Sequence, residues 1–499
     1  MCDLPSLVLR RTVSRVAALA LLLSLILGRL PTAFASTFTI PCTAGVGDTA
    51  ALVAALAAAG SNGEPDTLSL GEACAYESAV LLNVQADAGY LLTILGNGSA
   101  LLSIDDGDPT SSRPGLLAVD PSAKVEIRDL TVRDSFLTAV TNRGELTMRN
   151  VVLEYNFGNA VDNYGLLNMQ RSSVRNGGST GLFNVGIASL ANTTFHSNSG
   201  SPGIVTNMEN AILFLYNVTI SQNTVPFGVG LANTGTALVD NSIIANNVQG
   251  NECLNLPGST FMARNTLVED HSCGALDGSN GNKTGIDPNL EAATPTALFL
   301  RPLEGSPVID AGSNSLIPVG ADRDQANRPR ILNTVVDMGA YEYAPPTSLT
   351  VQLNLQGRAN PPGNTWIANT RVEVRPSGGG APYQTIAQTS NTFGRIFLSD
   401  LFPGAYDLWI KTDRTLAKIV PVLLTPGDSL TGIGDPLREG DADDSNSVTI
   451  TDFSILAAAF GAVSGGAGYD ARADFNGDAA VNISDFSLLA SNFGESGVP

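Results

Sequence analysis

Short β-branched segments recur at a nearly constant spacing between residues 78 and 270, and this repeat restricts the possible folds more than any other feature of the sequence. Successive segments begin 20 to 25 residues apart, at Asp129, Asn150, Ser172, Asn192, Asn217, Asn241 and Asn265. Two more asparagine columns keep the same period, one with Asn156, Asn198, Asn223 and Asn247, the other with Asn142, Asn163, Asn184, Asn207 and Asn233. A fixed period of this length indicates a solenoid, in which each repeat packs only on its neighbours.

The residue types in the repeat favour a mainly β fold, a right-handed parallel β-helix. Each β-branched strand ends at an asparagine or glycine at a fixed place, which predicts one coil per repeat of about 21 to 25 residues. Asparagines stacked in successive coils can hydrogen-bond to one another along the solenoid. A β-sandwich is the alternative, but its antiparallel strands would not place asparagine in register in every coil.

A second repeat lies between residues 441 and 494, where Val448–Gly461 returns as Val481–Gly494 after 33 residues. An acidic run precedes each copy, and its oxygen-bearing residues alternate. A loop that presents oxygens from positions 1, 3, 5, 7, 9 and 12 can surround a calcium ion. The predicted ligands are Asp441, Asp443, Ser445, the Ser447 carbonyl, Thr449 and Asp452 in loop one, and Asp474, Asn476, Asp478, the Ala480 carbonyl, Asn482 and Asp485 in loop two.

Loop one is expected to be the weaker site, because Ser445 stands where loop two has a carboxylate. An acidic solvated linker is the alternative interpretation of both runs. After each loop the apolar period becomes helical, which predicts one short helix per copy, ended by Gly461 and Gly494. The apolar faces expected to pack on each other are Phe453, Leu456 and Phe460 in the first helix and Phe486, Leu489 and Phe493 in the second.

These paired loops and helices, over residues 438–499, resemble the type I dockerin module. The resemblance implies two bound calcium ions and docking into a cohesin-like domain of a scaffold or surface protein. It also implies that loop positions 10 and 11 help to select the partner; they are Ile450, Thr451, Ile483 and Ser484. Two departures from the pattern are Asn446 and Ala479, which stand where glycine is usual at position 6, and asparagine tolerates positive φ better than alanine does.

The first 35 residues have the features of a secretory signal. Arg10, Arg11 and Arg15 precede an apolar run over residues 16–27, and small residues at 33 and 35 suit a cleavage site. An uncleaved membrane anchor is the alternative. No later segment is predicted to span a membrane, so we expect a secreted, extracellular protein, either free or attached to a cell surface.

Five cysteines would become four once Cys2 leaves with the signal, and the four form two local pairs. In an oxidising compartment the spacing favours disulfides between Cys42 and Cys74 and between Cys253 and Cys273, although other pairings also fit the sequence. The formal net charge of −20, from 27 basic and 47 acidic residues, argues against nucleic acid as a partner.

We expect the β-helix to occupy residues 36–345, with an N-terminal cap over 36–76 and a closing segment over 285–343. The closing segment resembles the tail of secreted, pectate-lyase-like β-helix proteins of the choice-of-anchor type, in residues that include Asp287, Asp310, Asp324, Arg328, Arg330, Asp337 and Glu342. Residues 347–437 alternate apolar and polar positions and resemble prealbumin-like β-sandwiches, which serve as spacers. Residues 438–499 form the calcium-binding module.

Candidate catalytic residues on the solenoid are Asp129, Arg133, Asp134, Glu154, Asp162, His196 and Glu209. We expect them not to fall at matched coil positions, and the resemblance to choice-of-anchor proteins carries no catalytic motif. The sequence therefore predicts a non-catalytic surface- or complex-associated protein whose β-helix binds a glycan or a partner and which is held through the calcium module. The alternative is an extracellular polysaccharide lyase or glycoside hydrolase delivered by the same module.

Overall fold

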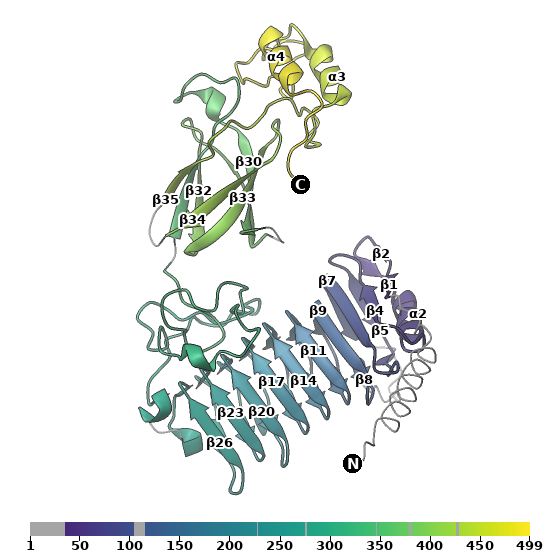
Figure 1. Cartoon of the computed structure of the whole chain (residues 1–499), viewed down its shortest axis with the longest axis vertical. Coiled ribbons are helices and arrows are strands. Elements are labelled where there is room, and N and C mark those ends of the chain that lie inside the picture. The colour runs from purple at the N-terminus through teal and green to yellow at the C-terminus, as the bar shows by residue number, and fades with distance from the viewer. Residues whose placement is uncertain are drawn as a thin grey trace, which may run out of the picture. The chain divides into compact units, whose positions relative to one another are not determined.

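The computed structural model describes residues 35–103, 115–226, 228–274, 277–345, 347–378, 382–425 and 429–499, so the predicted signal segment lies, apart from its last residue, outside the described residues. The chain forms two compact units, Met1–Tyr343 and Ala344–Pro499. The described part is mainly β and contains three α-helices, α2 (Thr49–Ala59), α3 (Ile450–Ala459) and α4 (Ile483–Asn492) (Figure 1). None of these helices is long and apolar enough to cross a membrane.

The first unit is a parallel β-helix, as the repeat predicts. Its strands stack coil upon coil in a 20-stranded and an 8-stranded sheet (Figure 1). Glu145 pairs with Leu166 and Ile187 pairs with Ile212, so successive coils are 21 and 25 residues long. Short 3₁₀ turns follow the last coils, η1 (Ser272–Gly274), η2 (Ser279–Gly281) and η3 (Asn314–Leu316).

The strands of the larger sheet fall into two stacked rows. One row contains β1 (Ser36–Thr39), β4 (Asp66–Ser69), β7 (Leu91–Ser103), β9 (Lys124–Arg133), β11 (Glu145–Arg149), β14 (Leu166–Gln170), β17 (Ile187–Ala191), β20 (Ile212–Tyr216), β23 (Thr236–Asp240) and β26 (Thr260–Arg264). The other contains β5 (Ala75–Ser78), β12 (Val152–Glu154), β15 (Ser173–Arg175), β18 (Thr194–His196), β21 (Thr219–Ser221), β24 (Ile243–Ala245), β27 (Leu267–Val268) and β28 (Lys283–Thr284), and it is joined by the long strands β7 and β9. The smaller sheet contains β6 (Leu82–Val84), β8 (Leu117–Val119), β10 (Val140–Asn142), β13 (Val161–Asn163), β16 (Leu182–Asn184), β19 (Gly203–Asn207), β22 (Val229–Asn233) and β25 (Asn251–Asn255).

Alternation along each strand produces the β-helix core. One inward column consists of residues in register in five consecutive coils, all with no exposed surface: Leu146, Leu167, Ala188, Leu213 and Ala237. Burial of a single leucine side chain stabilises a fold by about 1.5–3 kcal/mol. The repeat thus buries a continuous apolar interior that no single coil could enclose.

Asparagine ladders run inside the coils, as the sequence predicts. The side chain of Asn142 donates to Asn163 at 2.7 Å, and Asn163 donates to Asn184 at 2.8 Å. The row continues through Asn207 and Asn233 to Asn255, with donor–acceptor distances of 2.7–2.8 Å. A second row joins Asn198, Asn223 and Asn247. Because every other member of the two rows is buried and Asn255 is partly buried, these amides are not available on the surface to a glycan.

The residues that begin the repeated segments mark a corner with a left-handed backbone. Asn150, Asn192, Asn217, Asn241 and Asn265 all have φ between 47° and 55°, a conformation that asparagine accepts more readily than most residues. The predicted register is wrong by one residue in a single coil. Arg171, with φ 49°, occupies the corner there, and Ser172 lies one position later.

The N-terminal cap forms around α2. Asp48 is the N-cap of this helix, since its carboxylate accepts the backbone N–H of Ala51 at 2.9 Å, and Gly60 is the C-cap. Strands β2 (Cys42–Thr43) and β3 (Val46–Gly47) form an adjacent hairpin. Both predicted disulfides are present, Cys42–Cys74 in the cap and Cys253–Cys273 near the last coils.

The second unit begins with a β-sandwich. Its three-stranded sheet contains β29 (Thr347–Gln352), β32 (Arg395–Leu401) and β35 (Ser429–Gly432), and its four-stranded sheet contains β30 (Asn369–Pro376), β31 (Gln384–Thr389), β33 (Gly404–Thr412) and β34 (Lys418–Leu424). Alternate residues of both sheets, among them Val351, Val372, Ile396 and Leu408, form one buried core. The 3₁₀ turn η4 (Asn364–Trp366) adds Trp366 to it.

Helices α3 and α4 follow the sandwich, and their predicted apolar faces are only partly correct. Leu456 and Leu489 are buried in a shared core. The rings of Phe453 and Phe486 lie 6.4 Å apart, and each side chain remains 37% exposed. Phe460 and Phe493 do not join this face. Both helices end one residue earlier, and the extended C-cap leaves each phenylalanine 53% exposed.

Candidate metal centre

Loop one, residues 441–452, leads directly into α3 and is shaped by its own carboxylates. Asp452 accepts the backbone N–H of Ala442 at 2.7 Å with one oxygen and that of Thr449 at 2.7 Å with the other. Asp441 accepts the N–H groups of Ser445 and Asn446, both at 2.9 Å. These bonds wrap the loop around its own acidic residues and form a capping box at the start of α3.

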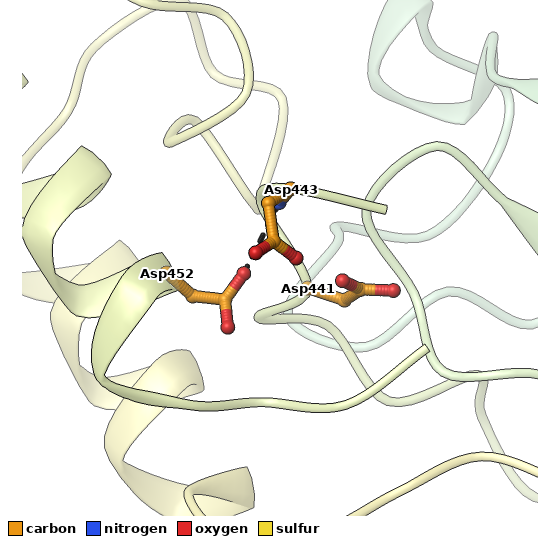
Figure 2. A group of neighbouring side chains, drawn as sticks. All are labelled: Asp441, Asp443 and Asp452. Atoms are coloured by element: carbon orange, nitrogen blue, oxygen red, sulfur yellow. Dashed lines mark hydrogen bonds between the residues drawn. The ribbon is translucent and has the colours of Figure 1, made fainter. Parts of the chain in front are cut away.

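Three carboxylates of loop one converge (Figure 2). One oxygen each of Asp441, Asp443 and Asp452 lies within 4.8 Å of the others. Asp441 and Asp452 have no exposed surface, whereas Asp443 is exposed to solvent. Such a group of oxygens suits a hard divalent cation of calcium size, because it combines negative charge with a flexible loop. Among the described residues, only loop one brings three acidic groups this close together.

Loop two, residues 474–485, repeats the bonds from positions 5, 6 and 9 of loop one and also that from position 3, where Asp443 donates its N–H to Asp452 at 3.1 Å. Asp474 accepts the N–H groups of Asp478 at 3.1 Å and Ala479 at 3.0 Å. Asp485 accepts those of Asn476 at 3.1 Å and Asn482 at 2.9 Å. The equivalent bonds show that the sequence duplication is also a structural duplication, including the capping box at the start of α4.

Position 6 has a left-handed backbone in both loops, where the dockerin pattern has glycine. The φ angle is 63° at Asn446 and 71° at Ala479. Asparagine is among the residues that tolerate this region, whereas alanine pays a cost of order 1 kcal/mol for it. Ala479 therefore stores backbone strain at a position that loop two requires.

The two halves are joined by reciprocal backbone pairing. In the middle of loop one, Val448 donates its N–H to the Glu495 carbonyl after α4, at 2.9 Å. In the middle of loop two, Val481 donates to the Ala462 carbonyl after α3, at 2.9 Å. Both valines have no exposed surface. Each loop therefore depends on the segment that follows the other helix.

Burial shapes the electrostatics of both loops. It raises the pKa of Asp441 and of Asp485, although backbone N–H groups and, for Asp441, the ammonium of Lys411 oppose this effect. Buried carboxylates with raised pKa values gain when a cation replaces their lost hydration. Lys411 on β33 was not among the predicted site residues, and nothing in its local sequence distinguishes it, since it belongs to the sandwich.

Helices α3 and α4 carry equivalent exposed apolar residues. Ile450 and Ile483, at loop position 10, are 65% and 64% exposed. Phe460 and Phe493 add matching exposed rings at the other ends of the helices. Exposed apolar groups of this kind mark a surface suited to a partner.

The candidate catalytic residues of the β-helix occupy different surroundings, and one expectation about them is wrong. Arg133, Glu154 and His196 do share one register position in the coils, together with Arg175 between the last two. Glu154, Arg175 and His196 make internal contacts, whereas Arg133 is 39% exposed. Arg175 pairs with Glu154 at 2.7 Å, and the Ala297 carbonyl accepts from both Arg175 and His196.

Burial lowers the pKa of His196 to about 4, so its ring is neutral near pH 7. The remaining candidates lie apart from that ring or serve other contacts. Asp162 accepts from Thr138 and Asn159, and Asp129 accepts from Asn150. Asp134 forms an exposed ion pair with Arg133 at 3.5 Å, and Glu209 is exposed at a turn.

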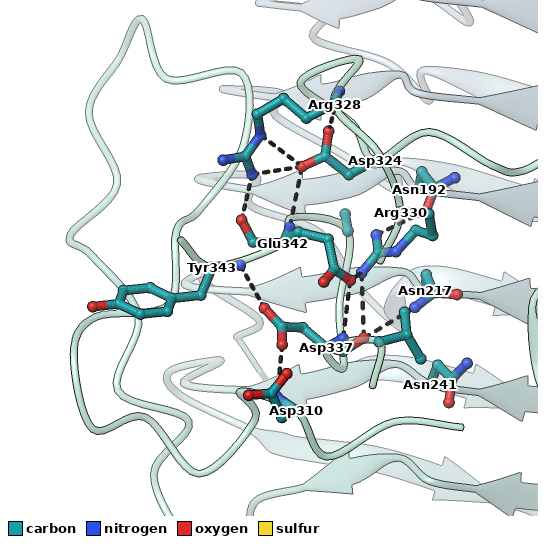
Figure 3. A network of polar contacts seen from close by, with 12 residues as sticks. Asn192, Asn217, Asn241, Asp310, Asp324, Arg328, Arg330, Asp337, Glu342 and Tyr343 are labelled. Carbon is teal, nitrogen blue, oxygen red and sulfur yellow. Dashed lines mark hydrogen bonds and ion pairs between the residues drawn. The ribbon is translucent and has the colours of Figure 1, made fainter. Parts of the chain in front are cut away.

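The closing segment brings together a second cluster of carboxylates, two of which form ion pairs with arginines (Figure 3). Arg328 pairs with Asp324 at 2.6 Å, and Arg330 pairs with Glu342 at 2.6 Å. Arg330 also donates to Asn192, a corner asparagine of the β-helix, at 2.9 Å. Burial raises the pKa of Glu342, and the Arg330 guanidinium opposes that shift. The cluster therefore anchors the segment to the coils.

No protein-family model matches the sequence, and comparison with curated proteins gives no match. Among solved structures, the chain is similar to two interface mutants of a type II cohesin–X-dockerin complex from Acetivibrio cellulolyticus. The mutant altered at the C-terminal interface is 20% identical, with 30% of this chain and 97% of that chain covered and a TM-score of 0.25. The mutant altered at the N-terminal interface is 19% identical over the same shares, with a TM-score of 0.24.

Proposed function

We propose that residues 438–499 are a dockerin-type module that binds two calcium ions and holds an exported β-helix protein on a cohesin-like domain of a scaffold or surface protein. The observation that carries this proposal is the equivalence of the two loops. Asp441 and Asp474 accept the backbone N–H groups of loop positions 5 and 6, and Asp452 and Asp485 accept those of positions 3 and 9. Two loops with the same hydrogen bonding are expected to bind the same ion.

Calcium suits these loops because of their ligand types. Besides carboxylates, each loop offers a side-chain oxygen at position 9, from Thr449 or Asn482, and a backbone carbonyl at position 7. Hard oxygen ligands on a flexible loop are typical of calcium sites, whereas the described loops contain no sulfur or imidazole for a softer metal. The ion would tie each loop to the start of its helix.

The docking surface would comprise the exposed faces of α3 and α4. Ile450 and Ile483 stand at the first residue of each helix and are about two-thirds exposed. Burial of such side chains against a partner would contribute about 1.5–3 kcal/mol each. Calcium would support this surface indirectly, because it fixes the loop from which each helix begins.

The β-helix would be the cargo, and its outer surface rather than its asparagines would bind a glycan or a partner. The rings of Phe136 and Phe157, in adjacent coils, stack with centroids 5.2 Å apart, and each side chain is 63% exposed. Exposed stacked rings offer a flat apolar platform with polar neighbours, Arg133 and Asp134. No catalytic step is needed for this role.

Calorimetry tests the calcium proposal directly. The protein from residue 36 onward, titrated with calcium at pH 7, should bind two ions, and the double variant Asp452→Asn/Asp485→Asn should bind none. Magnesium at the same concentration should give little heat, because it demands a stricter geometry. Absence of calcium-dependent heat from the unaltered protein would overturn the metal assignment.

The docking proposal needs a separate measurement. Immobilised type I cohesin domains should retain the unaltered protein in calcium and release it in chelator, and Ile450→Asp/Ile483→Asp should weaken retention at least tenfold while leaving calcium binding intact. Equal retention with and without calcium, or no retention by any cohesin in a panel, would refute this assignment while leaving the calcium sites in place.

A further inference from the structure

A lysine from the β-sandwich reaches into loop one. Lys411 lies near the end of β33, and its Nζ is 2.9 Å from Oδ2 of Asp441, the first predicted ligand of the loop. The same ammonium pairs with Oδ1 of Asp444. Only 8% of the Lys411 side chain and none of the Asp441 side chain is exposed. A cation that belongs to the protein is therefore buried against a carboxylate that would hold calcium.

Within the part of the chain that the structure describes, no lysine or arginine forms an ion pair with a carboxylate of loop two. The equivalent residue, Asp474, accepts the Tyr469 hydroxyl at 2.7 Å. Two arginines of the sandwich approach loop two, but they donate to backbone carbonyls, Arg414 to that of Asp474 and Arg358 to that of Phe475 at 3.2 Å. The sandwich thus contacts both loops, and it places a positive charge on a ligand carboxylate in loop one alone.

The predicted ligand sets do not differ in carboxylate number. Loop one has Asp441, Asp443 and Asp452, which is three, and loop two has Asp474, Asp478 and Asp485, which is also three. Loop one lacks a carboxylate at position 5, where it has Ser445, but it has one at position 3, where Asp443 corresponds to Asn476 of loop two. Loop one also contains Asp444, which is not a predicted ligand and which pairs with the same ammonium. What distinguishes loop one is therefore the lysine held directly on a ligand oxygen of Asp441, not the serine.

We propose that Lys411 is a built-in competing cation that lowers the calcium affinity of loop one about tenfold below that of loop two, so that the two loops fill in sequence as calcium rises. This inference rests on the proposed calcium function. The factor is about what a unit positive charge a few ångströms from a divalent ion causes in a strongly screening environment. The sandwich is then part of the regulation of the module as well as a spacer.

The contact also stabilises the calcium-free state. Without calcium, the ammonium partly compensates Asp441, whose charge would otherwise be buried without a counter-ion. Asn446 adds a second tie, since its side chain accepts the N–H of Ala417 in the sandwich at 2.8 Å. Loss of the lysine charge should therefore destabilise the calcium-free protein and strengthen calcium binding, two effects of opposite sign.

Two single-site backgrounds test this with the protein from residue 36 onward. In Asp485→Asn, which leaves loop one, Lys411→Met should raise calcium affinity about tenfold by calorimetry. In Asp452→Asn, which leaves loop two, the same substitution should change it less than twofold. Lys418→Met is the matched control, because Lys418 donates to the carbonyls of Ile433 and Asp435 and touches no carboxylate of either loop.

Thermal unfolding provides a second test in case the Asp485→Asn or Asp452→Asn variant folds poorly. In the otherwise unaltered protein, Lys411→Met should lower the melting temperature in chelator and widen the gap between chelator and saturating calcium. An equal fall in both conditions with unchanged affinity would mean that Lys411 is only a structural ion pair, and the inference would be wrong. Calcium binding by neither loop would instead refute the proposed function itself.

Discussion

The closing segment of the β-helix and the two loops of the second unit both gather carboxylates, and they neutralise them differently. In the closing segment, Arg328 and Arg330 are themselves buried and each forms an ion pair at 2.6 Å. In the loops, six predicted carboxylate ligands face one buried ammonium, that of Lys411. In the closing segment each arginine pairs with one carboxylate, and the buried carboxylate of Asp337 accepts two backbone N–H groups. The loops have a larger surplus of negative charge, which an external cation would balance.

The two units therefore differ in the interactions that stabilise them. Arg330 and Glu342 lie 12 residues apart, and Arg330 also reaches Asn192, 138 residues away, so a long-range fold is secured by residues of the protein alone. In each loop, by contrast, the carboxylates at positions 1 and 12 accept backbone N–H groups from within the same loop, at most 10 residues away. A unit secured by its own ion pairs should be indifferent to calcium, and a unit with surplus charge should respond to it.

The largest expected effect comes from breaking the internal cluster. Arg330→Met removes a guanidinium that is 1% exposed and leaves the polar groups of Glu342 and Asn192 without their partner. The free energy of unfolding of the first unit should fall by about 3–5 kcal/mol. Denaturant unfolding followed by far-ultraviolet circular dichroism measures this, and the transition of the second unit should not move.

Arg301→Met is the matched control for that substitution. Arg301 also pairs with a glutamate of the closing segment, Glu291 at 3.3 Å, but its side chain is 52% exposed. An exposed ion pair contributes about 0–1 kcal/mol, so this variant should unfold nearly as the unaltered protein does. Equal losses for both variants would show that burial does not make the internal cluster special.

Removal of calcium should act on the other unit. Chelation should lower the stability of the second unit by about 2.7 kcal/mol for each loop whose dissociation constant lies a hundredfold below the calcium concentration. The chain has two tryptophans, Trp366 and Trp409, both in the sandwich. Tryptophan fluorescence therefore reports this unit alone. A chelator-induced shift in the circular-dichroism transition of the first unit, with no change in fluorescence, would reverse the comparison.

The smallest expected effect concerns the helix caps inside the loops. Thr449 and Asn482 cap α3 and α4 by accepting the N–H of Thr451 and Ser484. In chelator, Thr449→Ala and Asn482→Ala should each cost about 1 kcal/mol in the second unit, measured by tryptophan fluorescence. Ser454→Ala and Ser487→Ala, at exposed positions of the same helices, are the controls and should cost nearly nothing. Unequal cap losses would show that the loops are not equivalent without calcium.

The sequence predicts the β-helix and its asparagine ladders well, because equivalent residues of a solenoid recur once per coil and so appear as a period in the sequence. It predicts the loops for the same reason, since a duplication displays matched oxygens. The one-residue error at Arg171 arose because Ser172 also fits a polar corner, and backbone φ is not visible in residue type. Phe460 was misplaced because the helix ends one residue before it, and helix ends are poorly defined by apolar spacing.

Long-range pairs could not be predicted from single-sequence patterns. Nothing near Lys411 shows that it meets Asp441, and nothing near Ala297 shows that its carbonyl covers His196 and Arg175. These contacts depend on where loops return over a finished scaffold. The sequence therefore predicted the acidic residues that loop one brings together but not the lysine that distinguishes one loop from the other.

The asparagine ladder has a consequence for how this protein can evolve. In the row from Asn142 to Asn255, each interior amide gives a hydrogen to the next coil and takes one from the coil before. An insertion of a few residues would leave two amides facing unlike neighbours, whereas the gain or loss of an entire coil with its asparagine would leave the row intact. Lineages carrying this architecture should thus differ in length by complete turns, while the outward side chains between the ladders drift freely.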